Sequence, residues 1–332
     1  MFDLRLDEVK GWVLSRGYRT VALQMPEGLK SHASRVASEL AHDTGAEFIV
    51  LGDPCYGACD LSRSFEDYAE ALVHFGHSAM PSLQASEDVL FVEVFHQGDI
   101  GDMLLPALRL LGDRVGLLAT VQYLPMLLQA EDFLVRHGRQ VFIGEGDGRI
   151  AHPGQVLGCN RSAAESVEAS VDGFLFIGEG DFHPLAVSLG TDRPVLVLNP
   201  LDGSLRTLED KKERILRRRF ASIQSAMDAR SFLVIVSSKR GQDRFPMAEQ
   251  ALRDIRAAGK EAMMLVIEEV SPDRLMHYPV DAYVNTACPR IALDDQVLYR
   301  RPMLTLPELD IVLGKEQWGS YRFDAISPAQ QR

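Results

Sequence analysis

The stretch Gly52-Asp53-Pro54-Cys55-Tyr56-Gly57-Ala58-Cys59-Asp60 decides the fold, because it is the first of three places where an expected strand leads into a cysteine. The second place is Val156-Leu157-Gly158-Cys159-Asn160, and the third is Asn285-Thr286-Ala287-Cys288-Pro289-Arg290. Cys59, Cys159 and Cys288 are separated by 100 and 129 residues. If the three act together, the fold must bring distant strand ends to one point, and the chain would be built around a metal.

The composition is that of an ordinary globular protein. The chain has 332 residues, of which 46% are hydrophobic, so it can bury a large core, and its length suggests two or three domains. Four cysteines are too few for a disulfide scaffold and suit core, catalytic or metal-binding roles in a reducing compartment. The net charge of -12 argues against direct binding of nucleic acid through broad attraction to phosphates.

The hydrophobic pattern gives no sign of a membrane protein. No apolar run approaches the ~18 residues that a membrane span needs. The acidic start Met1-Phe2-Asp3-Leu4-Arg5-Leu6-Asp7-Glu8 does not resemble a secretory signal. We therefore expect a cytoplasmic protein without a membrane contact.

Strand and helix patterns alternate along the chain. In the first third, apolar segments at 20–24, 47–51, 71–75 and 89–95 predict strands, and an amphipathic segment at 29–42 predicts a helix. This alternation is typical of parallel sheets with right-handed crossovers.

The same pattern continues to about residue 285, and turn-rich segments at 98–102 and 199–204 divide it. We therefore expect an α/β fold of three similar domains, 1–98, 99–202 and 203–332, each a small parallel sheet flanked by helices and carrying one of the three cysteines. The later expected elements are strands at 115–119, 140–143, 156–157, 194–198, 232–237, 262–267 and 282–285, helices at 103–111, 124–137, 208–226 and 247–258, and irregular structure at 304–318.

The positions of the cysteines favour ligation over core packing. Buried cysteines are common in protein cores. Loops at strand ends that contain Gly or Pro are poor places for core filling, and ligand sites of open parallel sheets lie beyond the carboxyl ends of the strands. Cys55 is expected to be a non-ligand, because the turn at 56–58 points it differently from Cys59.

Soft thiolate ligands select zinc, copper(I) or an iron-sulfur cluster. The local C-x2-C pairs of structural zinc sites are absent from the sequence. A 4Fe-4S cluster held by only three cysteines would leave one iron open to the amino and carboxylate groups of a substrate.

Five motifs strongly resemble the archaeal family of diphthamide biosynthesis enzymes. The resemblance spans the chain from about residue 23 to 295, and the order of the cysteine loops makes it specific. The motifs are Pro26-Glu27-Gly28-Leu29, Gly52-Asp53-x-x-Tyr56-Gly57-Ala58-Cys59-Asp60, His74-Phe75-Gly76-His77-Ser78, Phe182-His183-Pro184-Leu185 and Asn285-Thr286-Ala287-Cys288-Pro289-Arg290-Ile291.

The resemblance implies a homodimer of three-domain subunits in which Cys59, Cys159 and Cys288 hold a 4Fe-4S cluster. It implies that the cluster, reduced by an electron donor, cleaves S-adenosylmethionine (AdoMet) between its sulfur and its γ-carbon. The resulting 3-amino-3-carboxypropyl radical would add to C2 of a histidine imidazole on translation elongation factor 2, and methylthioadenosine would be released. This reaction is the first step of diphthamide synthesis.

Two strand-end loops supply candidate AdoMet contacts. Ser237, Lys239 and Gln242 follow the expected strand at 232–237, and Gln242 resembles part of the family's Gly-Gln loop. Glu27 and Gly28 are similar candidates in the first domain. A solvated turn is the alternative interpretation of these loops. The histidines His74, His77 and His183 are expected to be structural.

Two rival functions remain open. A quinolinate-synthase-like dehydratase would use a three-cysteine cluster as a Lewis acid on a small diacid and would need neither AdoMet nor a protein partner. A non-catalytic scaffold with a structural metal would only bind the translation factor.

Overall fold

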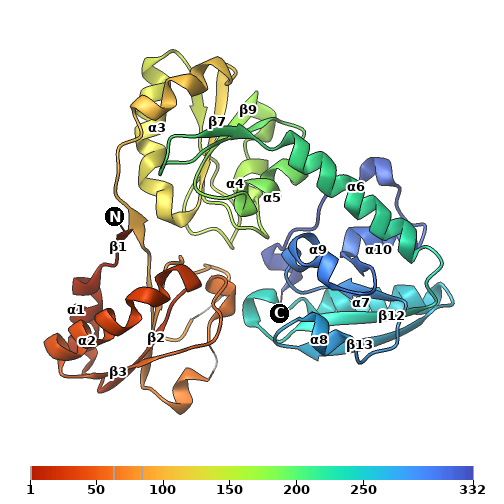
Figure 1. The fold of residues 1–332 in the computed structure, drawn as a ribbon, viewed down its shortest axis with the longest axis horizontal. Helices are drawn as coiled ribbons and strands as arrows, with labels where there is room; N and C mark the ends of the chain where they lie inside the picture. Colours follow the sequence, from red (N-terminus) through yellow and green to blue (C-terminus); the bar gives the residue numbers. More distant parts are fainter. Residues whose placement is uncertain (1, 63, 84, 332) are drawn as a thin grey trace.

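The protein is an α/β structure in which three mostly parallel sheets lie at the corners of a triangle around a common centre (Figure 1). The computed structural model describes residues 2–62, 64–83 and 85–331. Among these residues, no helix is both long enough and apolar enough to cross a bilayer. The α/β class expected from the sequence is confirmed.

The first sheet has the order β3-β2-β4-β5, and all of its strands run parallel. Buried aliphatic side chains of α2, among them Val36 and Leu40, pack with those of β2 in one core, so the helix covers the sheet through its apolar face. The elements are α1 (Leu6–Arg16), β2 (Thr20–Gln24), α2 (Ala33–Thr44), β3 (Glu47–Val50), β4 (Ala71–Phe75) and β5 (Val89–Val92).

The expected strand at 89–95 is shorter than predicted, because β5 ends at Val92. Phe95 and His96 form a separate strand, β6 (Phe95–His96), which pairs antiparallel with β1 (Phe2–Asp3). The chain then leaves the first sheet for the second.

The second sheet has the order β11-β10-β9-β7-β8, and only β11 is antiparallel. Its two faces belong to two separate cores, one containing α3 and the other containing α5. The elements are β7 (Arg114–Ala119), α3 (Leu124–Arg136), β8 (Gln140–Phe142), α4 (Ser162–Glu165), β9 (Gly173–Ile177), α5 (Phe182–Gly190), β10 (Val195–Leu198) and β11 (Leu205–Thr207).

The third sheet has the order β13-β12-β14-β15 and is parallel. Its central strand, Ser-Phe-Leu-Val-Ile-Val-Ser, is a continuous apolar run because helices cover both of its faces. Figure 1 shows α6 running from the second sheet to the third. The elements are α6 (Glu209–Ala226), β12 (Ser231–Ser237), α7 (Phe245–Ala257), β13 (Glu261–Ile267), α8 (Pro272–Leu275), β14 (Ala282–Asn285), α9 (Arg290–Asp294), β15 (Met303–Leu304) and α10 (Leu306–Val312).

Three local expectations are wrong. The expected helix at 103–111 is two short 3-10 helices, η4 (Asp102–Leu104) and η5 (Pro106–Arg109), where Pro106 cannot donate a helical hydrogen bond. The segment at 304–318 contains a helix, α10, which begins with a capping box between Thr305 and Glu308. No strand leads into Cys159, since residues 155–160 form only isolated bridges between turns.

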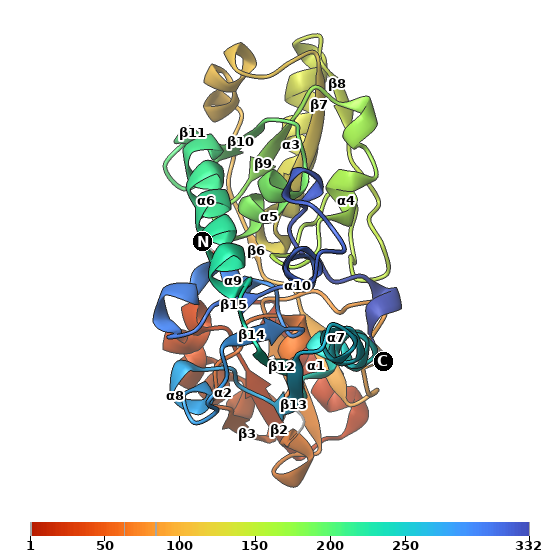
Figure 2. The ribbon, with the colours of Figure 1, turned by 90° about the vertical axis from the view of Figure 1, so that its right-hand side faces the viewer.

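The C-terminal tail returns from the third sheet to the second (Figure 2, dark blue). Phe323 packs into the core that contains α5, and its carbonyl accepts a hydrogen bond from Arg161 beside the start of α4. Ile326 donates its backbone N–H to the carbonyl of Cys159 at 2.8 Å. The tail therefore holds the second cysteine loop from outside the second sheet. The two expected domain boundaries stay predictions, and β11 lies beyond the one at 202.

Candidate metal centre

The loops that follow strands of all three sheets surround one cavity, which contains all three cysteines of interest. Its empty space, part of which is open to solvent, is about 810 Å³. The lining includes Cys59, His77, Thr120, Gln122, Cys159, Phe182, His183, Gln242, Cys288 and Arg290.

Cys59 lies in a single 3-10 turn, η2 (Ala58–Asp60), after β3. The loop after β12 packs directly on this turn, because a Cβ on Gly241 would lie 2.3 Å from both Cα and Cβ of Cys59. The side chain of Gln242 donates from Nε2 to the Cys59 sulfur at 3.4 Å. A residue without a side chain is therefore required at Gly241 to bring the first and third sheets together.

Cys159 lies at the tip of a tight turn that is closed by two backbone hydrogen bonds between Leu157 and Asn160, of 3.0 and 3.3 Å. The buried guanidinium of Arg149 donates from Nη2 to the Cys159 sulfur at 3.7 Å and to the carbonyl of Gly241 at 3.1 Å. Arg149 thus connects the second cysteine loop to the loop that packs on Cys59.

Cys288 follows β14 by three residues. Asn285 donates from Nδ2 to the Cys288 carbonyl at 2.8 Å and closes the turn. The fully buried guanidinium of Arg244 donates to the carbonyls of Thr286 and Ala287 at 2.9 and 3.0 Å. These bonds fix the backbone immediately before the cysteine.

The three sulfurs line one cavity, and the pKa values of two of them, Cys59 and Cys288, are raised. Burial raises the pKa of the Cys59 thiol to about 11, and the Cys159 sulfur adds to this rise. Burial also raises the pKa of Cys288, followed by the effects of Cys159 and Cys59. A metal that binds the three thiols displaces their protons and neutralises the repulsion among the thiolates that result. This donor set of three sulfurs around one cavity fits a 4Fe-4S cluster.

A second group, Cys55, His74 and His77, also could hold a metal, since its ligand atoms lie within 4.8 Å of one another. In the structure, however, the two histidines belong to a hydrogen-bonded chain. Gln24 donates from Nε2 to Asp60, so its Oε1 accepts from His74 Nδ1 at 2.9 Å. His74 Nε2 must then accept from His77 Nδ1, also at 2.9 Å.

Sequence reasoning did not anticipate this chain of contacts. Its signal is the spacing His74-x-x-His77 at the end of β4, where the second side chain reaches the cavity. Burial lowers the pKa of His77 to about 4 and that of His183 to about 3, so both cavity histidines are neutral near pH 7.

Of the five candidate AdoMet contacts, Gln242 lines the cavity. Lys239 instead forms ion pairs with Asp60 and Glu269, both at 2.9 Å. Ser237 is buried and accepts a hydrogen bond from the Lys239 backbone. Glu27 and Gly28 are exposed at the start of the turn η1 (Glu27–His32), outside this lining. The cofactor-binding role assigned to these residues stays a prediction.

The cavity is also lined by Arg290 and Phe182, to which sequence analysis assigns no role. Arg290 belongs to the third cysteine stretch and Phe182 to one of the five family motifs, and each lies within a few residues of a strand end. Neither residue type has a periodicity or spacing that would mark it as a cavity residue in advance.

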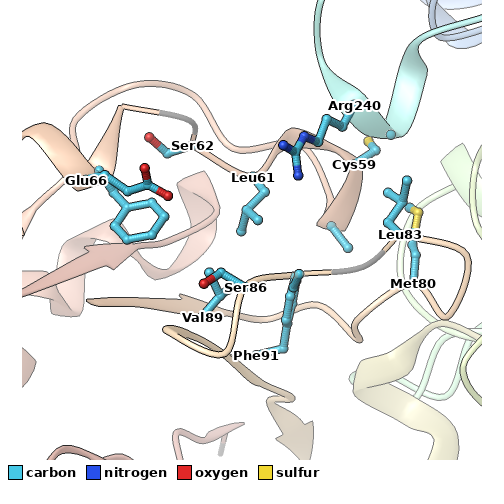
Figure 3. A pocket seen from close by; sticks show the side chains of 14 residues that line it. Cys59, Leu61, Ser62, Glu66, Met80, Leu83, Ser86, Val89, Phe91 and Arg240 are labelled. Carbon is cyan, nitrogen blue, oxygen red and sulfur yellow. The ribbon is translucent and has the colours of Figure 1, made fainter. Parts of the chain in front are cut away.

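A neighbouring cavity reaches Cys59 from the side of the first sheet (Figure 3). Leu61, Val89 and Phe91 give it an apolar wall, and Arg240 lies across from them near Cys59. Cys59 therefore lies between two hollows, one shared by all three cysteine loops and one formed mainly by the first sheet.

Comparisons with known proteins agree over nearly the whole chain. The family model described as a putative diphthamide synthesis protein matches residues 25–322. A 2-(3-amino-3-carboxypropyl)histidine synthase of Pyrococcus horikoshii is 38% identical over 315 residues, which are 93% of this chain and 90% of that protein. The synthase of Methanocaldococcus jannaschii is 26% identical and covers 98% and 94% of the two chains.

The same family is found among solved structures. The crystal structure of Dph2 from Pyrococcus horikoshii with a 4Fe-4S cluster has a TM-score of 0.90 to this fold at 36% identity. The match covers 98% of this chain and 95% of that one. Sequence and structure thus agree with the resemblance carried by the five motifs, and the chain belongs to the diphthamide synthesis family.

Proposed function

We propose that this enzyme transfers the 3-amino-3-carboxypropyl group of AdoMet to C2 of a histidine imidazole on translation elongation factor 2, the first step of diphthamide synthesis. The observation that carries the proposal is that Cys59, Cys159 and Cys288, which come from three different sheets, line one cavity. The names of the relatives and the 4Fe-4S cluster of the related crystal structure support it.

In this proposal the three cysteines hold a 4Fe-4S cluster whose fourth iron has no protein ligand. When bound and reduced by an electron donor, the cluster supplies the electron that breaks the bond between the sulfur and the γ-carbon of AdoMet, giving the 3-amino-3-carboxypropyl radical and methylthioadenosine. The protein's own part is to hold the methionine portion so that this bond, and no other, is the one aligned for cleavage.

Two side chains donate hydrogen bonds to the cysteine sulfurs. Gln242 donates to Cys59, and Arg149 donates to Cys159. Hydrogen bonds to cluster sulfurs are one of the ways in which proteins set a reduction potential. His77 and His183, which are neutral because of burial, add no further positive charge to the cavity.

The test is a product analysis under anaerobic conditions. The cluster is reconstituted, dithionite and AdoMet are added, and the nucleoside that forms is identified by mass spectrometry. Methylthioadenosine supports the proposal, and deoxyadenosine would instead indicate ordinary radical AdoMet chemistry.

Formation of neither nucleoside would favour one of the two rivals. Turnover of a small diacid would then indicate the quinolinate-synthase-like dehydratase, and binding of elongation factor 2 without any reaction would indicate the scaffold. The homodimer and the cytoplasmic location belong to the same proposal, and sedimentation of the reconstituted protein tests the dimer.

A further inference from the structure

Arg290 lines the cavity, and part of its guanidinium has no hydrogen-bond partner among the residues that the structure describes. The residue is 5% exposed, and its Nη2 donates to Asp294 at 2.9 Å. Its Nε and Nη1 atoms are buried and have no hydrogen-bond partner among the residues that the structure describes. Buried donors that are left unpaired are costly, and those of a charged group more so. An acceptor that binds in the cavity would remove this cost.

The arginine is held in place by stacking. Its guanidinium carbon lies 4.0 Å from the centroid of the Phe182 ring. The ring in turn packs on Gly158, where a Cβ would lie 2.1 Å from Cε1 of Phe182. Stacking on an aromatic ring fixes the orientation of the guanidinium plane and leaves the guanidinium charged. The side chain of Arg290 is therefore held between the second and third cysteine loops, because it stacks on Phe182 and Phe182 packs on Gly158.

The chemistry of these donors specifies the kind of ligand. An arginine cannot lose its proton in a protein and offers N–H groups that match a carboxylate. Within the described part of the chain, Asp294 is its one acidic partner; the Asp294 side chain is 46% exposed and contacts Nη2, so Nε and Nη1 remain for a second anion. The group transferred in the proposed reaction carries one carboxylate.

We infer that Arg290 binds the carboxylate of the 3-amino-3-carboxypropyl portion of AdoMet. This inference rests on the proposed function and adds the residue that orients the transferred group. Anchoring the carboxylate beside Cys288 fixes one end of the methionine portion, and the sulfur and γ-carbon then lie within the same cavity as the three cysteines.

The test compares AdoMet with decarboxylated AdoMet, which lacks only the carboxylate. Binding of both ligands to the reconstituted holoenzyme is measured by anaerobic calorimetry for the wild type, Arg290→Gln and Arg290→Lys. Arg253→Gln, on the exposed face of α7, serves as the control. Iron content and the cluster absorbance are recorded for each protein.

We expect Arg290→Gln to bind AdoMet about 10- to 100-fold more weakly, the range for a lost charged hydrogen bond. Its affinity for decarboxylated AdoMet should stay within about 2-fold of the wild type, because that ligand has no group for Arg290 to bind. Arg290→Lys keeps the charge and loses the planar donors, so its affinity for AdoMet should lie between those of the wild type and Arg290→Gln.

Equal weakening of both ligands, or no weakening of either, overturns the inference while leaving the proposed function intact. Loss of the cluster in both variants would make Arg290 a support of the metal centre and would also overturn it. A wild-type holoenzyme that fails to bind AdoMet contradicts the proposed function itself, and the inference falls with it.

Discussion

Arg244 and Asp324 form a buried two-point ion pair that joins the start of α7 to the C-terminal tail. Nη1 and Nη2 of Arg244 lie 3.0 and 2.7 Å from Oδ1 and Oδ2 of Asp324. The same guanidinium holds the backbone before Cys288, and two residues after Asp324 the tail bonds to the carbonyl of Cys159. One ion pair therefore connects the supports of two cysteine loops.

We predict that Asp324→Asn lowers the free energy of unfolding by about 3 kcal/mol, because it leaves the buried Arg244 charge without a counter-charge. Urea denaturation measures the change, and iron content should fall with it. The matched control is Asp192→Asn, which removes a surface ion pair with Arg322 and should cost less than about 1 kcal/mol. Equal effects of the two changes would contradict this account.

Replacing Cys159 by Ala should abolish both the cluster and the turnover, since two thiolates cannot replace three. Replacing Cys55 by Ala should leave bound iron unchanged, because Cys55 contacts His74 outside the three-cysteine cavity. Iron per chain after reconstitution distinguishes the two. A loss of a third or more of the iron on removal of Cys55, or retention of the cluster without Cys159, would refute the ligand assignment.

Gly241→Ala should reduce iron incorporation several-fold, because the added Cβ would lie 2.3 Å from Cys59 and displace its turn. Gly319→Ala is the control, since nothing lies within 4 Å of a Cβ at that position. Reconstitution followed by cluster absorbance measures the effect. Full iron incorporation into the Gly241→Ala protein would show that the Gly241 loop and the Cys59 turn can move apart without loss of the metal centre.

Stability should fall as the pH drops from about 6.5 to about 3, because His77, with a folded pKa of about 4, and His183, with one of about 3, take up protons in the unfolded chain before they do so in the folded one. Their folded pKa values are lowered because burial favours the neutral imidazoles, so the stability that these groups contribute is complete above about pH 6.5 and is lost as the pH falls through the folded pKa values. The free energy of unfolding, measured by urea at several pH values, checks the direction. His183→Gln should show a shallower dependence, and an unchanged slope would exclude His183 as a contributor.

The α/β class was predictable because apolar strands alternate with amphipathic helices, and the convergence of the cysteines was predictable because parallel strands place their carboxyl ends together. Local sequence pattern does not predict the structure where long-range contacts determine it. Cys159 does not follow a strand, and Ile326, 167 residues further along the chain, supports its loop.

The helix α10 was missed although its capping box, Thr305-Leu306-Pro307-Glu308, is a recognisable local signal. Arg149, Arg244 and Arg290 could not have been selected from the other arginines, because only the folded chain shows which guanidinium groups are buried. Gln242 was predicted from its place after a strand together with its resemblance to the family's Gly-Gln loop, and it does line the cavity.

The bond between Ile326 and Cys159 has a consequence for biosynthesis. On the ribosome, a growing chain could complete its first two sheets and still lack the support of the second cysteine loop until residue 326 has emerged. Delivery of iron and sulfide to this protein would then be most productive once residue 326 has reached the second cysteine loop, and a chain cut before Phe323 would be a poor acceptor for them.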